Sequence, residues 1–529
     1  MADYDLAIIG GGLNGVSIAR DAAGRGLRVI LLEQGDLSAG ASQASPRLIH
    51  GDLQVLERRA LFRVRAALRE RDIWLRTAPH LVRPMRFVIP AHSDERQPWV
   101  LRSWLLLYDR LAARPRLPAS ATIDITHHPV GNALQRPIGL AFEYSDCVVD
   151  DSRLVVLTAV DAAERGADIR TGARCVRADR LDSWRLAVID RGHRRVVTAR
   201  ALVNASGAWT ASVAETVLRM RAPEFGAVRI SQIVVRRLFD TDNVYVFQNS
   251  DRRLIFASPY ERDFTLIGTT DVEHTGAVGE ARIDADETAY LCAQASRYFE
   301  KPVTPQDVVW SYAGVRPLLD DESGDPSAVT RDYSLELDTA KAALLTVWGG
   351  KITTFRKLAE EAADLLVAPL AGALPREGSA ENASTPRGAW TRGAYLPGGD
   401  LSAWIGKAQR PDTDFTRFAQ AAALRYPQLP AAVCHRLARA YGARIDAVLA
   451  GGELGAEIAP GLFEVEMNYL HDFEWARSAE DVLWRRSKLG LHFDPAQRAA
   501  VADWCAAHWP DPVAQPSTTT LRQTETAWN

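Results

Sequence analysis

The sequence predicts an α/β protein with three parts: a Rossmann-like nucleotide-binding domain, an antiparallel β domain and a C-terminal all-α domain. Three observations support this prediction. A strand, glycine turn, helix and second strand fill the first 33 residues, β-branched residues alternate over 228–267, and helical periodicity dominates from about 415 to 506. At 529 residues the chain is also too long for one simple core.

The opening pattern has the order that a dinucleotide site requires. Residues 5–9 are apolar and predict a buried strand, and residues 10–15 match G-x-G-x-x-G. A helix is expected over 16–24, and a second apolar strand over 27–32 ends at Glu33. This pattern predicts a dinucleotide-binding βαβ unit.

Each residue type in this unit has a physical role. Gly10 allows the tight turn, Gly12 lets the backbone approach a pyrophosphate, and Gly15 lets the helix pack closely on the sheet. Glu33 is placed to accept hydrogen bonds from ribose hydroxyls, and its charge would repel a 2′-phosphate. The pattern does not separate NAD from FAD, but its place at the N-terminus favours FAD. The alternative is a glycine-rich turn without a ligand.

Later apolar strands at 200–209 and 344–348 indicate that the chain returns to the nucleotide domain. The expected division is a nucleotide domain of residues 1–80, 148–225 and 308–370, a substrate domain of 81–147 and 226–307, a linker of 371–393, a helical domain of 394–510 and a disordered tail of 511–529.

Composition excludes several functions. A net charge of −3 gives no case for nucleic-acid binding, and the five scattered cysteines indicate neither disulfides nor a metal site. The sequence has no signal peptide and no apolar run long enough to span a bilayer, so a cytoplasmic protein is expected. Residues 98–108 are rich in Trp and Leu and suit an interfacial helix, although a core-packing helix fits equally well.

Five later stretches, together with the opening pattern, resemble the FAD-dependent, quinone-linked glycerol-3-phosphate dehydrogenases of the aerobic type. They are residues 142–154, 267–271, 312–333, 349–358 and 481–490. The resemblance covers nearly the whole chain. It implies a nucleotide domain of the glutathione-reductase and amino-acid-oxidase type.

The resemblance also implies a reaction. FAD would lie along the opening pattern, and hydride would pass from the secondary alcohol of glycerol 3-phosphate to flavin N5, leaving dihydroxyacetone phosphate. A membrane quinone would take the electrons, so the chain would work at the cytoplasmic face of the inner membrane. A homodimer is left open.

The resemblance assigns site residues position by position. The expected catalytic residues are His50, Thr269, Arg316 and Lys351, and the expected substrate-binding residues are Gln54, Gln232, Arg316 and Arg331. The expected FAD-binding residues are Gly10, Gly12, Leu13, Asn14, Gly15, Glu33, Gln34, Ser42, Ser45, Arg47, Leu48, His50, Gly51, Cys175, Ala205, Gly207, Trp209, Gly314, Gly350, Lys351, Ile352 and Thr353.

Physical chemistry supports several of these roles. Arg316 and Arg331 carry the planar forks that suit a phosphate. Lys351 precedes a predicted helix, so its charge and the helix dipole would act together beside a reduced flavin. Thr269 can hydrogen-bond a substrate oxygen.

The substrate half departs from the family pattern. Gln54 and Val55 stand where the family has arginine and tyrosine, and Asp52 replaces a glycine. Gln232 replaces a histidine and cannot act as a general base near neutral pH. Since a charge-assisted hydrogen bond contributes about 1.5–3 kcal/mol, phosphate affinity would fall by one to two decades.

Two alternatives therefore stay open. One is a related flavin enzyme with another hydroxy or amino substrate, and with oxygen or another partner as acceptor. The other is a non-catalytic flavin-binding interaction protein. Arg47, Arg58 and Arg229 are candidates to replace the missing cation.

Overall fold

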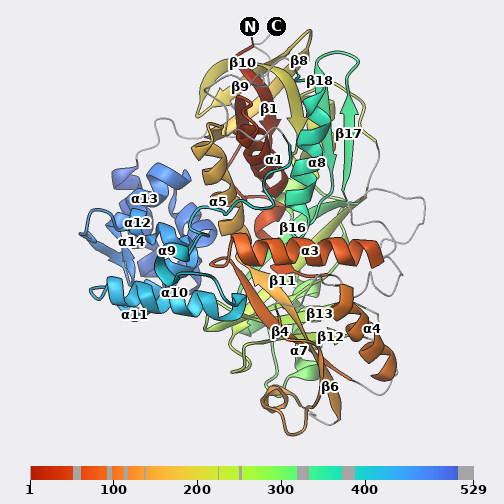
Figure 1. Cartoon of the computed structure of the whole chain (residues 1–529), viewed down its shortest axis with the longest axis vertical. Helices are drawn as coiled ribbons and strands as arrows, with labels where there is room; N and C mark the ends of the chain where they lie inside the picture. The colour runs from red at the N-terminus through yellow and green to blue at the C-terminus, as the bar shows by residue number, and fades with distance from the viewer. Residues whose placement is uncertain are drawn as a thin grey trace.

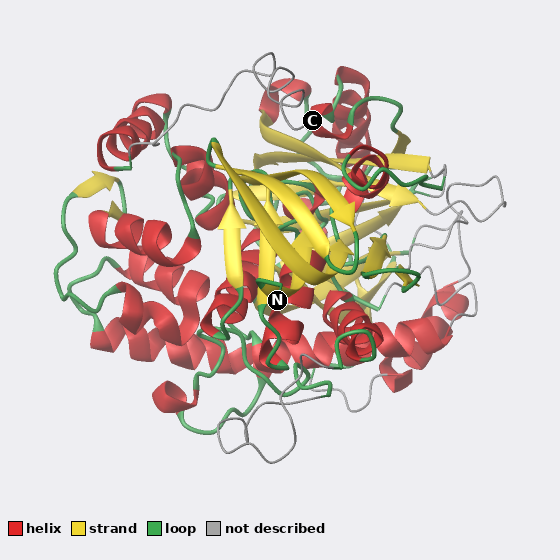
Figure 2. Cartoon of the chain, turned by 90° about the horizontal axis from the view of Figure 1, so that it is seen from above, coloured by secondary structure: helices red, strands yellow, loops and turns green. Residues whose placement is uncertain are grey.

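Two β-sheets and a C-terminal helical region make up the chain in this computed structural model (Figure 1). The structure describes residues 2–51, 61–91, 98–111, 117–135, 139–223, 226–249, 253–318, 333–371 and 388–509. Seen from above, helices surround the sheets (Figure 2).

The first sheet confirms the predicted Rossmann-like fold. Its strands, in spatial order, are β17 (Ser334–Asp338), β18 (Ala343–Trp348), β10 (His193–Asn204), β1 (Tyr4–Ile9), β2 (Val29–Glu33) and β7 (Asp168–Thr171), with β8 (Ala173–Arg180) and β9 (Trp184–Asp190) paired beside β10. The strands from β18 to β7 are parallel. β1 and β18 are almost wholly buried, as expected when both faces of a parallel sheet are covered.

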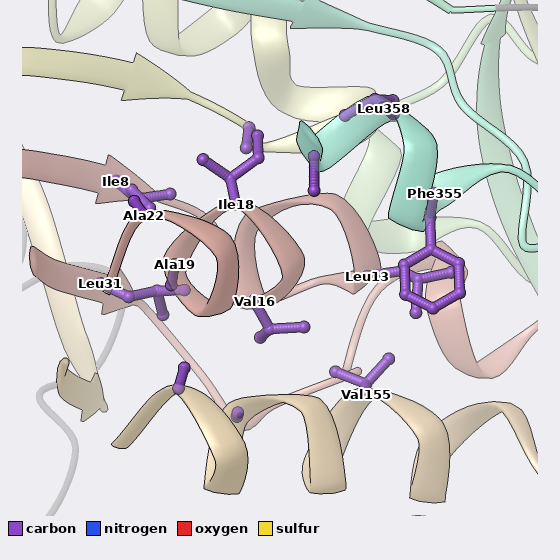
Figure 3. Packing of buried hydrophobic residues seen from close by; sticks show 14 of the residues in the cluster. Ile8, Leu13, Val16, Ile18, Ala19, Ala22, Leu31, Val155, Phe355 and Leu358 are labelled. Atoms are coloured by element: carbon purple, nitrogen blue, oxygen red, sulfur yellow. The ribbon is translucent and has the colours of Figure 1, made fainter. Parts of the chain in front are cut away.

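Three helices cover one face of this sheet. They are α1 (Leu13–Gly24), α5 (Asp151–Glu164) and α8 (Phe355–Val367). Figure 3 shows Val16 of α1 pointing toward α5, which carries Val155, while Leu13 lies beside Phe355 of α8. Leu13 and Phe355, 342 positions apart in the sequence, therefore share one core.

The second sheet is mostly antiparallel, as predicted for 228–267. Its main order is β15 (Val272–Glu273), β11 (Gly226–Arg236), β14 (Phe264–Gly268), β13 (Leu254–Tyr260), β12 (Asn243–Gln248), β4 (Val82–Pro90), β6 (Leu140–Val149) and β3 (Leu48–Ile49), with β16 (Val308–Leu318) beside β11 and β5 (Ala121–Asp124) beside β6. Helices α3 (Leu61–Thr77), α4 (Pro98–Leu111) and α7 (Ala285–Tyr298) pack around it.

Two strands that the expected division assigns to the nucleotide domain pair in this second sheet. β16 runs antiparallel to β11 from Gly226 opposite Leu318 to Val235 opposite Val308, and β3 pairs with β6. Gly314 of β16 also lies against Ala41 and Ala44 of the loop after β2, so the second sheet contacts a segment that belongs to the first half of the molecule.

The C-terminal region is mainly helical. Its helices are α9 (Ser402–Ile405), α10 (Pro411–Arg425), α11 (Ala431–Tyr441), α12 (Ile445–Val448), α13 (Glu464–Glu474) and α14 (Pro495–His508). It also contains a small hairpin, β19 (Glu457–Ala459) with β20 (Leu462–Phe463), that the sequence analysis did not predict. Within the range of predicted helical periodicity, residues 481–486 form the π-helical turn η8 (Asp481–Arg486).

A buried ion pair joins this region to α5. Arg153 donates to both carboxylate oxygens of Glu474, with 2.8 Å between Nη2 and Oε1, and both side chains are at most 1% exposed. The same guanidinium donates to the Ala440 carbonyl and lies 4.8 Å from the ring centre of Tyr441. Removing either partner would leave a buried charge without its counterion.

Substitution Arg153→Met should therefore lower the free energy of unfolding by about 3–5 kcal/mol, because Glu474 would stay buried and unpaired. Urea denaturation followed by tryptophan fluorescence would measure it. Lys357→Met, which removes the exposed Lys357–Glu361 pair, is the matched control and should change stability by less than about 1 kcal/mol. Equal effects of both variants would contradict this account.

Candidate active site

In the glycine turn between β1 and α1, backbone atoms lie closer together than any side chain would allow. Gly10 has φ +113°, and a Cβ on it would lie 2.5 Å from the Ala205 carbonyl oxygen. A Cβ on Gly15 would lie 1.9 Å from the Gly10 carbonyl oxygen. Gly12 caps α1 without a side-chain oxygen, which leaves N–H groups of the first helical turn for an anion.

Glu33 lies at the end of β2, where the pattern predicts it. Its Oε2 accepts a hydrogen bond from Gly11 N at 2.7 Å, and its Oε1 accepts one from Gly35 N at 2.8 Å. Burial raises the pKa of Glu33, while these N–H donors act in the opposite direction. The carboxylate is thus held beside the glycine turn and retains lone pairs for ribose hydroxyls.

The loop after Glu33 folds back over the turn. Ser42 Oγ accepts from Leu13 N at 3.0 Å, and Ser38 N donates to the Gly11 carbonyl at 3.2 Å. Gln34 is exposed at the start of this loop. The loop and the glycine turn therefore form one hydrogen-bonded unit.

Later segments return to the same place. Asn14 Nδ2 donates to the Gly349 carbonyl at 3.0 Å, and a Cβ on Gly350, which has φ +117°, would lie 2.9 Å from that amide. A Cβ on Gly314 would meet Ala44 at 2.7 Å, so β16 lies directly against the loop. Trp209 follows Gly207 and lies beside Gly40.

Several other predicted cofactor residues lie in neighbouring elements. Ile352 packs on the first core, Thr353 is buried near the start of α8, and Leu48 is buried in β3. The Cys175 thiol is buried in β8 and donates to the Arg177 carbonyl at 3.6 Å.

Gln232 ties the second sheet to the loop. Its Nε2 donates to the Ser45 carbonyl at 2.8 Å, and its Oε1 accepts from the Tyr312 hydroxyl at 3.2 Å. The residue is 1% exposed. Both ends of the amide are thus engaged within the protein, in a position that sequence reasoning gave to substrate.

Thr269 and Arg316 lie at or next to two strands, β14 and β16, that pair with β11. Thr269 follows β14, and its hydroxyl donates to the Thr270 carbonyl at 3.0 Å. Arg316 lies on β16 opposite Val228 and is half-buried. Lys351, also half-buried, lies in the turn between β18 and α8, next to Gly350.

His50 and Gly51 end β3 beside a buried polar network. Gly51 N donates to the Tyr108 hydroxyl at 2.7 Å, and that hydroxyl donates to Asp146 Oδ2 at 2.5 Å. Arg71 Nη1 donates to Asp146 Oδ1 at 2.8 Å. Burial raises the pKa of Asp146, whereas the charges of Arg71 and His50 act to lower it.

Arg47 and Arg229, two of the cations proposed to replace the missing arginine, already lie beside carboxylates. Arg47 is 6% exposed, lies 3.1 Å from Asp151 Oδ1 and stacks 4.6 Å from the ring centre of Tyr260. Arg229 pairs with Asp284 and, at 2.7 Å, with Glu287. Gln54, Arg58 and Arg331 lie outside the described residues.

Within the described ranges, no group of three or more His, Cys, Asp or Glu side chains could hold a metal ion. The structure adds contacts of Tyr108, Arg71 and Tyr260 that the sequence analysis did not assign. Asp146 and Tyr312 lie in stretches that resemble the family, but their pairing with Tyr108 and with Gln232 depends on the fold.

The donor set fits FAD. Glycines clear a path for a pyrophosphate at the start of α1, a carboxylate stands at the end of β2, and the loop of residues 34–44 encloses both. Later segments at Ala205, Gly314 and Gly349 also contact this unit, as expected for a ligand that runs along the domain.

Family models match both parts of the chain. Residues 5–356 match the FAD dependent oxidoreductase family, and residues 389–508 match the C-terminal domain of alpha-glycerophosphate oxidase. Curated relatives include a glycerol-3-phosphate dehydrogenase of Pseudomonas aeruginosa, 43% identical over 96% of both chains, and the aerobic glycerol-3-phosphate dehydrogenase of Escherichia coli, 39% identical over 95% of this chain and 97% of that one. D-erythritol 1-phosphate dehydrogenase of Brucella abortus is 42% identical over 94% of this chain and 97% of its own.

Solved structures agree on the fold. The glycerol-3-phosphate dehydrogenase of Bacillus halodurans, complexed with FAD, matches with a TM-score of 0.73 at 24% identity, covering 99% of this chain and 94% of that one. These matches confirm the predicted resemblance, fold and cofactor. The chain belongs to the family of FAD-dependent glycerol-3-phosphate dehydrogenases and is a flavin-dependent oxidoreductase.

Proposed function

We propose that the chain oxidises the secondary alcohol of sn-glycerol 3-phosphate to the ketone of dihydroxyacetone phosphate, in the cytoplasm. The main support is that the chain matches glycerol-3-phosphate dehydrogenases over nearly its whole length, including the glycine turn. Bound FAD supplies the acceptor for the hydride that leaves the substrate carbon.

Side chains from both sheets have roles in this proposal. Arg316 binds the phosphate through its planar N–H donors, with Arg331 as a second fork predicted from sequence. Thr269 hydrogen-bonds the substrate oxygen, and Lys351 stabilises negative charge that builds up at the cofactor.

His50 takes the proton of the substrate hydroxyl in this proposal. The buried carboxylate of Asp146 interacts electrostatically with His50 and is hydrogen-bonded to Arg71 and Tyr108. The hydrogen bond from Gly51 N to Tyr108 holds the turn that carries His50. Gln232 does not replace the family's histidine as a base, because an amide does not titrate in this range.

Adding one methyl group at the glycine turn tests whether this turn binds the cofactor. Gly15→Ala should give a colourless protein, because the new Cβ would lie 1.9 Å from backbone oxygen. The visible absorption spectrum of the purified protein measures this. Gly393→Ala meets nothing within 4 Å and should stay yellow. A flavin-loaded Gly15→Ala protein would show that the turn does not hold FAD.

Anaerobic reduction tests the substrate. Millimolar sn-glycerol 3-phosphate should bleach the flavin within seconds, and stopped-flow absorbance would follow the reaction. A protein that stays yellow with this compound, yet is reduced by dithionite, would rule out glycerol 3-phosphate as substrate. It would leave the flavin site intact.

A longer polyol phosphate is a second candidate substrate. The D-erythritol 1-phosphate dehydrogenase relative and the replacements at Gln54, Val55 and Gln232 favour it. In that case D-erythritol 1-phosphate should bleach the flavin faster than glycerol 3-phosphate. The variant Gln54→Arg/Val55→Tyr should then raise the apparent affinity for glycerol 3-phosphate by about tenfold.

We further propose a membrane quinone as acceptor, with α4 as the docking surface. None of the helices that the structure describes is long and apolar enough to cross a bilayer. α4 instead buries Leu105 and Tyr108 while it exposes Trp99 by 69% and Leu106 by 43%. Tryptophan and leucine on one helix face suit an interfacial position.

Substitution Trp99→Ser/Leu106→Ser should weaken binding to vesicles of anionic phospholipid at least tenfold, because it removes the exposed apolar contacts. Vesicle flotation measures the bound fraction. Leu424→Ser is the control, since Leu424 is 84% exposed on α10 of the C-terminal region. Equal loss of binding in both variants would argue against α4.

A further inference from the structure

The segment of residues 481–490 resembles the family but has no role in the reaction proposed above. In the structure it reaches both halves of the site. Arg485 and Arg486 of η8 pair with Asp36, and Trp484 stacks on Trp310 of β16 with 4.8 Å between ring centres. η8 therefore contacts the loop after Glu33 and the strand that carries Tyr312 and Arg316.

The contact with Asp36 has the geometry of a strong ion pair. Arg486 Nη2 lies 2.7 Å from Asp36 Oδ1, Arg486 Nη1 lies 2.8 Å from Oδ2, and Arg485 Nε lies 2.6 Å from Oδ2. The Arg486 side chain is 0% exposed and that of Asp36 is 9% exposed. Burial acts to raise the pKa of Asp36, but the two guanidiniums hold it below its usual range.

The position of Asp36 links this pair to the cofactor site. Asp36 lies three residues after Glu33, whose carboxylate accepts from Gly11 N, and two residues before Ser38, whose N–H donates to the Gly11 carbonyl. The same loop supplies Ser42, which accepts from Leu13 N. Asp36 therefore attaches this loop to η8.

Arg486 is itself held in place. Its Nε and Nη2 donate to the Glu474 carbonyl at 3.2 and 2.7 Å, and Glu474 is the residue that pairs with Arg153 of α5. The guanidinium that pairs with Asp36 is therefore connected, through Glu474 and Arg153, to α5, the helix that packs against α1.

We infer that Arg486 is a positioning residue for FAD: through its fork to Asp36, the C-terminal region holds the 34–44 loop in the conformation that closes over the cofactor. This role is independent of the substrate and of the electron acceptor. The C-terminal region is then a component of the cofactor site.

The dissociation constant of FAD tests this inference. Arg486→Met and Asp36→Asn should each raise it by 10- to 100-fold, measured by equilibrium dialysis of apoprotein against FAD. Arg486→Lys, which keeps the charge but not the fork, should recover part of the affinity. The double variant Asp36→Asn/Arg486→Met should bind no worse than the single variants, because both act through one pair.

Two controls separate positioning from general stability. Arg444→Met removes another contact between the C-terminal region and α5, the pair with Glu164, and should leave the dissociation constant of FAD within twofold. Thermal unfolding of each apoprotein shows whether the fold is intact; if Arg486→Met does not fold, the isosteric Asp36→Asn variant decides.

Unchanged FAD affinity in Asp36→Asn would overturn the inference. So would equal loss in Arg444→Met. Because dialysis uses no substrate, these outcomes do not depend on whether glycerol 3-phosphate is oxidised.

Discussion

The close approach of backbone to backbone at the glycine turn is the constraint on which the rest of the structure depends. Gly15 lies so near the Gly10 carbonyl, and Gly10 so near the Ala205 carbonyl, that a methyl group at either position would overlap them. This contact brings α1 onto the sheet and brings the end of β10 beside the end of β1. The site for a pyrophosphate exists because no side chain occupies this space.

The two halves of the molecule meet around that turn. β16 belongs to the second sheet, yet its Gly314 lies against Ala41 and Ala44 of the loop of residues 34–44. Gln232 fixes this junction with hydrogen bonds to Ser45 and Tyr312. Gln232 is thus a neutral side chain whose amide donor and acceptor are both used within the protein.

Two arginines near the site lie beside carboxylates. Arg47 lies among carboxylates and against Tyr260, and Arg229 is paired with Asp284 and Glu287. A buried guanidinium that moved away from such partners would leave their charge without a counterion. Among the described residues, Arg47 Nε and Nη2 have no hydrogen-bond partner. Arg316, on the strand beside β11, carries the phosphate-binding role in our proposal.

The sequence by itself determined the elements and the cofactor. The opening pattern, the alternation over 228–267 and the family motifs depend on local spacing, and β1, α1, β2 and β11 form where these patterns predict them. The same patterns identified Gly10, Gly15 and Glu33, because a tight turn and a strand end restrict the residues that fit there.

Only the tertiary structure decided which distant side chains meet. Asp36 with Arg486, Tyr108 with Asp146, and Tyr312 with Gln232 are pairs separated by 38 to 450 residues. Each pair depends on how sheets and helices pack, and no spacing in the sequence connects one residue with its partner. A long-range ion pair produces no periodic pattern in the sequence. The attachment of the C-terminal region to the loop of residues 34–44 could therefore be found only in the fold.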